Sequence, residues 1–340
     1  MKRETSLSRP MALRRSAALA VGALAMSAVA LPSSSAAADS PDPPVVRIRN
    51  AAVRVVVVPE ARSDIQVRVV KANPKLPLYV GVSGATTVVD GHLQTWFLRC
   101  SGHGESLQVR TMDQGAFGYD DLPQVIIETP MAARVVTGGP GAGGAVTGSV
   151  GRAGSLSMDL GTCGDWTVAN VTGQLSIALG GSGDIASGAA GAAQLSISGS
   201  GRLRTQAIDG DLTAKVSGSG EVEASRAGRA DITVSGSGDV RLGALSGGLR
   251  ATITGSGDLK VDQLGGDFDA NVSGVGDIHV RDGQVGVMRT HISGSGDVSF
   301  GGTAQSLEAV ISGRGDVSVG AVTGNVEKRI SGAGVVHIGP

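Results

Sequence analysis

A six-residue phrase, Ser/Thr-Gly-Ser-Gly-Asp followed by an aliphatic residue, recurs ten times between residues 162 and 336 of this 340-residue chain. Successive copies lie 18 to 20 residues apart. A unit this short cannot bury an apolar face by itself, so neighbouring copies must stack and share one core. The acidic position of the phrase is occupied by Asp165, Asp184, Arg202, Glu221, Asp239, Asp258, Asp277, Asp297, Asp316 and Val335.

Residues 251–261 alternate small or apolar side chains with polar ones. A period of two is typical of a β-strand, whereas a helix repeats every 3.6 residues. Leucine-rich repeats of similar length need an Asn or Cys ladder and a helical segment, and the sequence shows neither pattern. The repeats therefore predict an all-β fold, a single-stranded right-handed β-helix (β-solenoid) of about ten 19-residue coils.

Equivalent positions of successive coils should lie above one another, about 4.8 Å apart. One inward aliphatic column is expected at Ile197, Val216, Val234, Ile253, Val272, Ile292, Ile311 and Ile330. The residues one position later should form an outward hydroxyl row, namely Ser198, Ser217, Ser235, Thr254, Ser273, Ser293, Ser312 and Ser331. The paired glycines of the phrase serve either a close backbone approach or a positive φ at the bend.

The first 38 residues have the pattern of an export signal. Arg14 and Arg15 precede an apolar run over residues 17–31, and three alanines end at Ala38. Met11 is an alternative start. We expect a signal peptide at 1–38, hence a protein exported to the periplasm or the cell surface, and no later stretch is long and apolar enough for a transmembrane segment.

Three further regions follow the signal. Residues 39–44 form a Pro-rich linker, and residues 45–138 contain several strand-like runs and most of the large aromatic side chains. Residues 139–340 contain the repeats. Because the open end of a solenoid must be covered against edge pairing, we expect 45–138 to be an N-terminal β region that caps the stack.

Charge and cysteine content limit the partners and the compartment. The chain has 29 Lys+Arg and 30 Asp+Glu; removal of residues 1–38 takes away five basic residues and one acid, which leaves a net charge of -5. Without a basic face, and with aromatics at 2%, nucleic-acid binding is disfavoured. Cys100 and Cys163 are the two cysteines, and in an oxidising compartment we expect a disulfide that stabilises the chain by about 4 kcal/mol; two buried thiols are the alternative.

The phrases at 235–240, 254–259 and 293–298, together with the export signal and the strand pair ending in Val-Val-Pro-Glu, resemble the auto-transporter adhesin, head GIN domain family. The resemblance covers about residues 45–340. It implies a single-stranded β-helix similar to pectin-lyase-type helices, a role in cell adhesion, and no recognised catalytic residues. This sequence shows no translocator, sorting motif or anchor after the repeats, so we do not expect it to secrete itself.

The acidic positions are the most suggestive candidate site, and Asp239, Asp258, Asp277, Asp297 and Asp316 form a possible ligand face. Such a row of carboxylates repels itself unless cations, donors or solvent compensate. Divalent-cation binding is one explanation; the other, which we favour, is that each Asp accepts backbone N–H groups of its own turn. The Gly-Gly-x-Gly-x-Asp pattern of calcium-binding rolls is not met.

Three other motifs carry no site. Arg314-Gly315-Asp316 spells an integrin tripeptide but occupies the ordinary positions of the repeat. Residues 139–144 match Gly-x-Gly-x-x-Gly, yet no helix follows to bind a phosphate. The five histidines are scattered, with no Cys or His spacing that suits zinc. We therefore expect no cofactor and no metal.

These observations favour a non-catalytic envelope or surface protein that contacts an envelope polymer, a glycan or a surface protein through its Ser- and Asp-lined face. Two alternatives stay open. A polysaccharide-active enzyme of the pectate-lyase-like β-helix type would need aromatic platforms and a walled cleft, but the repeats offer only Trp166, Phe268 and Phe300 and no long loops. A purely structural periplasmic protein would need no ligand at all.

Overall fold

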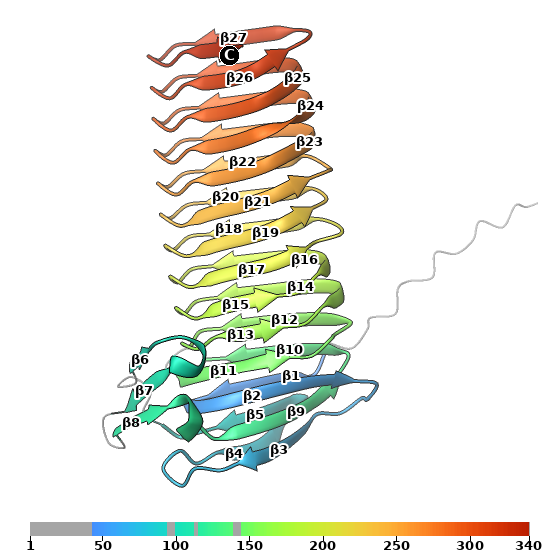
Figure 1. The fold of residues 1–340 in the computed structure, drawn as a ribbon, viewed down its shortest axis with the longest axis vertical. Helices are drawn as coiled ribbons and strands as arrows, with labels where there is room; N and C mark the ends of the chain where they lie inside the picture. The colour runs from blue at the N-terminus through green and yellow to red at the C-terminus, as the bar shows by residue number, and fades with distance from the viewer. Residues whose placement is uncertain (1–42, 94–98, 112–114, 139–143, 340) are drawn as a thin grey trace, which may run out of the picture. The chain divides into compact units, whose positions relative to one another are not determined.

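The computed structural model of the chain describes residues 43–93, 99–111, 115–138 and 144–339. The expected signal peptide, Trp96, Phe97 and most of the Gly-rich segment 139–144 lie outside these residues. The described residues form a β-solenoid of about 11 stacked turns (Figure 1), which confirms the all-β solenoid prediction. They contain no α-helix, only two short 3₁₀ helices, η2 (Gly104–Ser106) and η3 (Tyr119–Asp121).

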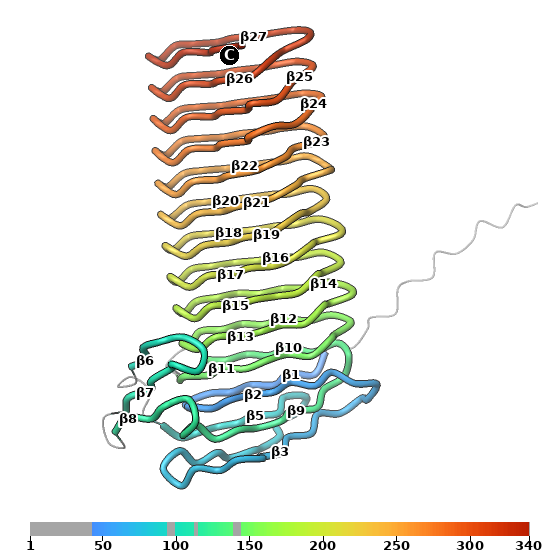
Figure 2. Tube along the Cα trace, viewed as in Figure 1, coloured from blue at the N-terminus to red at the C-terminus, as the bar shows by residue number. Residues whose placement is uncertain are grey.

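Each regular coil consists of two strands joined by two different turns. In one coil β17 (Arg202–Ala207) leads through a wide turn to β18 (Leu212–Val216), and the tight turn at 217–220 leads into the next coil. Each strand pairs in parallel with its equivalent one coil later, as in Arg202 opposite Glu221. The chain trace in Figure 2 shows this path repeated along the stack. Residues at the same position of successive phrases are thus paired, so the spacing of the phrase in the sequence sets the register of the strands.

The coils build two ladders, in which every pairing is parallel except the first of each, which is antiparallel. In spatial order, ladder one contains β4 (Tyr79–Ser83), β5 (Thr86–Asp90), β1 (Val45–Arg49), β10 (Ala132–Thr137), β12 (Ser155–Leu160), β14 (Val171–Leu179), β16 (Ala190–Ile197), β18, β20 (Ala230–Val234), β22 (Leu249–Ile253), the second halves of β23 (Leu259–Val272), β24 (Ile278–Ile292) and β25 (Val298–Ile311), and β27 (Val326–Ile330). Ladder two contains β3 (Gln66–Lys71), β9 (Gln124–Pro130), β2 (Ala51–Glu60), β11 (Gly144–Val150), β13 (Trp166–Val168), β15 (Asp184–Ser187), β17, β19 (Glu221–Ala227), β21 (Asp239–Leu245), the first halves of β23 to β25, β26 (Val317–Val322) and β28 (Val336–Ile338).

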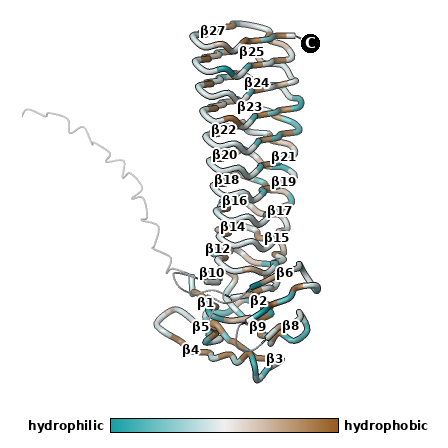
Figure 3. Tube along the Cα trace, turned by 90° about the vertical axis from the view of Figure 1, so that its left-hand side faces the viewer, coloured by the Kyte–Doolittle hydropathy of each residue, from teal (hydrophilic) through white to brown (hydrophobic). Residues whose placement is uncertain are grey.

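The core lies between the two ladders. The expected inward column pairs in register from Ile197 to Ile330, and its members up to Ile311 are at most 1% exposed. Each aliphatic side chain buried in this way contributes about 1.5–3 kcal/mol. Ile330 belongs to the last described coil and is 45% exposed. Figure 3 shows both hydrophobic and hydrophilic stretches on the stacked coils.

The two glycines of the phrase are required by the close approach of successive coils. A Cβ on Gly236 would overlap the carbonyl oxygen of Gly218, and a Cβ on Gly238 would overlap that of Gly220. Neither glycine has a positive φ. Of the two explanations that the sequence leaves open, close backbone approach is therefore the correct one at these turns.

The N-terminal strands do not follow the order of the sequence. β1 pairs with β5 on one side and β10 on the other, and β2 likewise lies between β9 and β11. The first coil of the chain is thus inserted between two later ones. Beyond it, β4 and β3 pair antiparallel with β5 and β9 and present their outer edges.

Candidate functional site

The tight turns lie above one another and form a continuous strip. We call this strip, with the acidic position after each turn, the tight-turn edge; its turns are residues 198–201, 217–220, 235–238, 254–257, 273–276, 293–296 and 312–315. The hydroxyl row expected from Ser198 to Ser331 is exposed along its whole length. A second exposed row, which we did not anticipate, consists of Ser200, Ser219, Ser237, Ser256 and Ser295.

The aspartates of the edge bind backbone amides, but not those of their own turn. The N–H of Asp258 donates to Oδ1 of Asp239 at 3.0 Å, and that of Asp277 donates to Oδ1 of Asp258 at 3.0 Å. The same bond continues from Asp297 to Asp277 at 2.8 Å, and from Asp316 to Asp297 at 2.7 Å. The expectation that each Asp caps its own turn is therefore wrong about the donor, which comes from the following coil.

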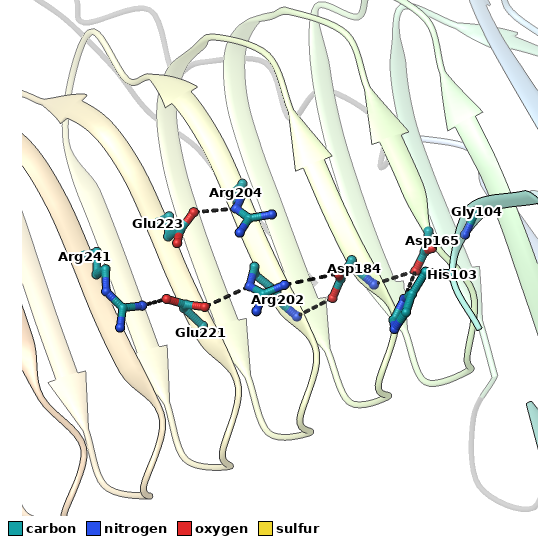
Figure 4. A network of polar contacts seen from close by, with 9 residues as sticks. All are labelled: His103, Gly104, Asp165, Asp184, Arg202, Arg204, Glu221, Glu223 and Arg241. Carbon is teal, nitrogen blue, oxygen red and sulfur yellow. Dashed lines mark hydrogen bonds and ion pairs between the residues drawn. The ribbon is translucent and has the colours of Figure 1, made fainter. Parts of the chain in front are cut away.

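Opposite charges compensate the acidic row in the middle of the stack (Figure 4). Arg202 lies between two acids, with Nη1 3.5 Å from Oδ2 of Asp184 and Nε 2.8 Å from Oε2 of Glu221. Arg241 contacts Glu221 and also Oδ2 of Asp239, at 3.3 Å. Because Arg202 lacks an acceptor oxygen, the N–H of Glu221 binds the carbonyl of Gly201 instead.

In the later coils, the described residues give the acidic row no such compensation. Among the residues that the structure describes, no ion pair is formed by Asp258, Asp277, Asp297 or Asp316, which we call the acidic segment. Each of these carboxylates uses Oδ1 for the bond between coils, and their side chains are half-buried or exposed. In the described part of the chain, no group of three or more His, Cys, Asp or Glu residues could hold a metal ion.

Asp165, the first acidic position of the repeat, contacts the loop of a small N-terminal sheet. This side sheet consists of β6 (Arg99–Ser101), β7 (Gln108–Thr111) and β8 (Gly115–Gly118). The Gly104 N–H donates to Oδ2 of Asp165 at 2.7 Å, and Nδ1 of His103 lies 3.3 Å from Oδ1. Cys100 of β6 and Cys163 of the adjoining turn form a disulfide. The expected bond is confirmed, and the alternative of two buried thiols is wrong.

A well-formed concavity of the described residues lies away from this edge. It is an open groove of about 730 Å³ across the wide turns of several coils. Its charged lining residues are Asp209, Arg226 and Asp282; Arg226 pairs with Asp209 at 3.1 Å. The groove is lined by no aromatic side chain, such as a carbohydrate-active site usually offers as a platform.

Stacked parallel coils and a repeated turn edge define this chain as a β-solenoid protein. It belongs to the family described as "Putative auto-transporter adhesin, head GIN domain", whose model matches residues 98–244 and 245–339. This match confirms the resemblance seen in the sequence.

Two solved structures are similar over most of their length. One is a crystal structure of a proposed lipid-binding protein from Parabacteroides distasonis, at 15% identity and a TM-score of 0.30, covering 87% of this chain and 92% of the other. The second is a proposed adhesin from Bacteroides fragilis, at 13% identity and a TM-score of 0.29, covering 87% and 91%. No curated protein sequence matches the chain. No helix among the described residues is long and apolar enough to cross a membrane.

Proposed function

We propose that this protein is an exported, non-catalytic, adhesin-like protein of the cell surface or envelope. It binds an envelope polymer, a glycan or a surface protein through its tight-turn edge. The acidic segment carries this proposal, because four carboxylates without ion-pair partners among the described residues follow one another in successive coils, beside two rows of exposed hydroxyls. Repeated weak contacts of one kind are suited to a partner that is itself repetitive.

The geometry of the edge supports display rather than catalysis. Its acids are fixed in place by the bonds between coils, and a polymer laid along the axis would meet an equivalent position about every 4.8 Å. A polysaccharide-active enzyme needs a general acid and a second carboxylate across a bound sugar. The turns of the edge are too short to wall such a cleft, and the family is named for adhesion.

The test is binding of the exported chain to purified envelope fractions and to a panel of soluble glycans, with and without calcium. The main variant changes Asp258, Asp277, Asp297 and Asp316 to Asn. The Asn side chain keeps an Oδ1 acceptor for the bond between coils and removes only the charge. A matched control makes the same change at four exposed aspartates outside the edge, Asp211, Asp231, Asp262 and Asp282.

We expect the edge variant to lose most of its binding, the control variant to keep it, and both to fold. Equal binding by the wild type and the edge variant would show that the acidic segment is only structural. Turnover of any glycan in the assay would replace adhesion by the enzymatic alternative. Absence of any bound fraction or glycan would favour the purely structural role.

A further inference from the structure

The last described coil has a lysine at a position where the equivalent residues of the earlier coils are uncharged. Lys328 of β27 pairs in register with Ala309, and the column continues inward through the stack. Its earlier members are Leu195, Ala214, Ile232, Ala251, Ala270, Thr290 and Ala309, which are all buried. A cation therefore occupies a core position at the end of the stack.

The side chain of Lys328 reaches from one ladder to the other. Its Nζ donates to the carbonyl oxygen of Val336 on β28, at 3.3 Å. Because β27 belongs to ladder one and β28 to ladder two, the methylene stem spans the space between the ladders while the ammonium group stays at the rim. Lys328 thus lies over the end of the apolar core.

The residues around Lys328 occupy core positions of the repeat, but no described residue covers them. Val326, Ile330 and Ile338 are 36%, 45% and 40% exposed. Their equivalents one coil earlier, Leu307, Ile311 and Val319, are at most 2% exposed. Among the described strands, β27 pairs only with β25, so its other edge presents free backbone groups of the kind that recruit further strands.

The sequence of β27, Val-Glu-Lys-Arg-Ile, is complementary to itself when two copies run antiparallel. With a twofold axis at Lys328, Glu327 of one copy lies opposite Arg329 of the other, and Val326 lies opposite Ile330. Opposite charges and apolar pairs across antiparallel strands are stabilising, and an interface of this symmetry closes as a dimer. The two Lys328 side chains alone conflict, because they would meet on the core side without a counter-ion.

We propose that the face formed by β27 and β28 is complementary to the same face of a second copy of this chain, and that Lys328 prevents the two copies from associating there. An inward-pointing charge on an edge strand prevents pairing at small cost to the monomer, whereas its burial under a second copy is strongly unfavourable. The wild-type chain is then a monomer at this face, although its backbone and its apolar residues match those of another copy.

The experiment compares the molar mass of the exported full-length chain and its Lys328→Ala variant by sedimentation velocity over a range of concentrations. Alanine is native at this position in four earlier coils, so the variant should fold. We expect a monomeric wild type and a variant that dimerises at least about a hundredfold more tightly, which corresponds to roughly 2.7 kcal/mol. Arg329→Ala, which removes a neighbouring outward charge, is the control and should stay monomeric.

A charge exchange tests the antiparallel arrangement. In the Lys328→Ala background, Glu327→Arg should abolish the dimer because Arg would then face Arg329 of the second copy, and the further change Arg329→Glu should restore it. A folded Lys328→Ala variant that remains monomeric overturns the proposal, as does a wild type that already dimerises through this face. Larger polymers, or a dimer that ignores the charge exchange, would contradict the twofold pairing.

Discussion

The amide of Asp277 donates to Oδ1 of Asp258 at 3.0 Å, so the acidic position of one coil is bonded to the same position of the coil before it. The identical bond links Asp239 to Asp258 and Asp297 to Asp316. Asp258, Asp277 and Asp297 each thus accept a bond from the next coil through Oδ1 and donate one to the previous coil through the backbone N–H. This reciprocity explains why the position is acidic in so many copies: its side chain satisfies a backbone N–H beside a turn of small residues.

Replacement of one such aspartate should separate its structural role from its charge. We expect Asp277→Ala to lower the free energy of unfolding by about 0.5–1.5 kcal/mol, because the N–H of Asp297 loses its acceptor. Asp277→Asn keeps an acceptor oxygen and should cost less than half as much. Denaturant titration of both variants measures the difference. An alanine variant as stable as the asparagine variant would show that water replaces the bond without loss.

The repeat made most of the fold accessible from sequence. Ile253 and Val272 occupy the same position of two phrases 19 residues apart, and the structure pairs them in that register. No comparable signal marks the N-terminal strands. β1 lies between β5 and β10, and β2 lies between β9 and β11. These pairings join segments of unlike sequence, so no repeat predicts which strands are neighbours.

The candidate site was accessible only in part. The sequence identifies the acidic positions and the first hydroxyl row, because both follow from the phrase. It does not show that the donor to Asp239 comes from Asp258, since that contact requires the spacing between coils. Nor does the sequence show which acids have a compensating charge. Arg202 itself occupies an acidic position of the repeat and pairs with Glu221 of the next coil, whereas in the sequence this arginine looks like an ordinary variation of the repeat.

One buried hydroxyl is a defect of the core. Thr290 lies between Ala270 and Ala309 in the buried column that ends at Lys328. It is 3% exposed, and its Oγ1 has no hydrogen-bond partner among the described residues. A buried hydroxyl without a partner is costly. We expect Thr290→Val, which has nearly the same shape, to raise the free energy of unfolding by about 1 kcal/mol. A decrease in the denaturation midpoint would mean that the hydroxyl is satisfied in solution.

The N-terminal coil should respond to acid through Asp90. Burial alone would raise the pKa of this carboxyl, but the N–H of His92 at 2.8 Å and Nε of Arg49 at 2.8 Å more than compensate, and its pKa is lowered from 3.8. A carboxyl with a lowered folded-state pKa stabilises the fold above its unfolded-state pKa, and this contribution is lost as the pH falls through the folded-state pKa.

We therefore expect Asp90→Asn to destabilise the protein at neutral pH and to lose less stability than the wild type when the pH falls below 3.8. Denaturant titrations at a series of pH values compare the two proteins. Asp64 is the control for a surface carboxyl: its pKa is also lowered, by the hydrogen bond from Arg62, yet it is solvent-exposed. Parallel stability curves for wild type and Asp90→Asn would contradict the assignment.

Finally, stacking of equivalent coils predicts opposite outcomes for two changes of length. Deletion of residues 236–254 removes one coil and joins Ser235 to Gly255, which restores the phrase and places Val234 below Val272 in the inward column. Each coil contacts only its neighbours, so the shortened chain should fold and melt within a few degrees of the wild type.

Insertion of one Ala after Ile232 instead turns Thr233 inward and Val234 outward. Because an aliphatic core residue contributes about 1.5–3 kcal/mol, the insertion should cost at least that much and break the pairing with the adjoining coils. Far-UV circular dichroism and thermal melting of both variants decide the matter: if the deletion unfolds the chain as thoroughly as the insertion, the stability of the solenoid does not arise from interchangeable neighbours.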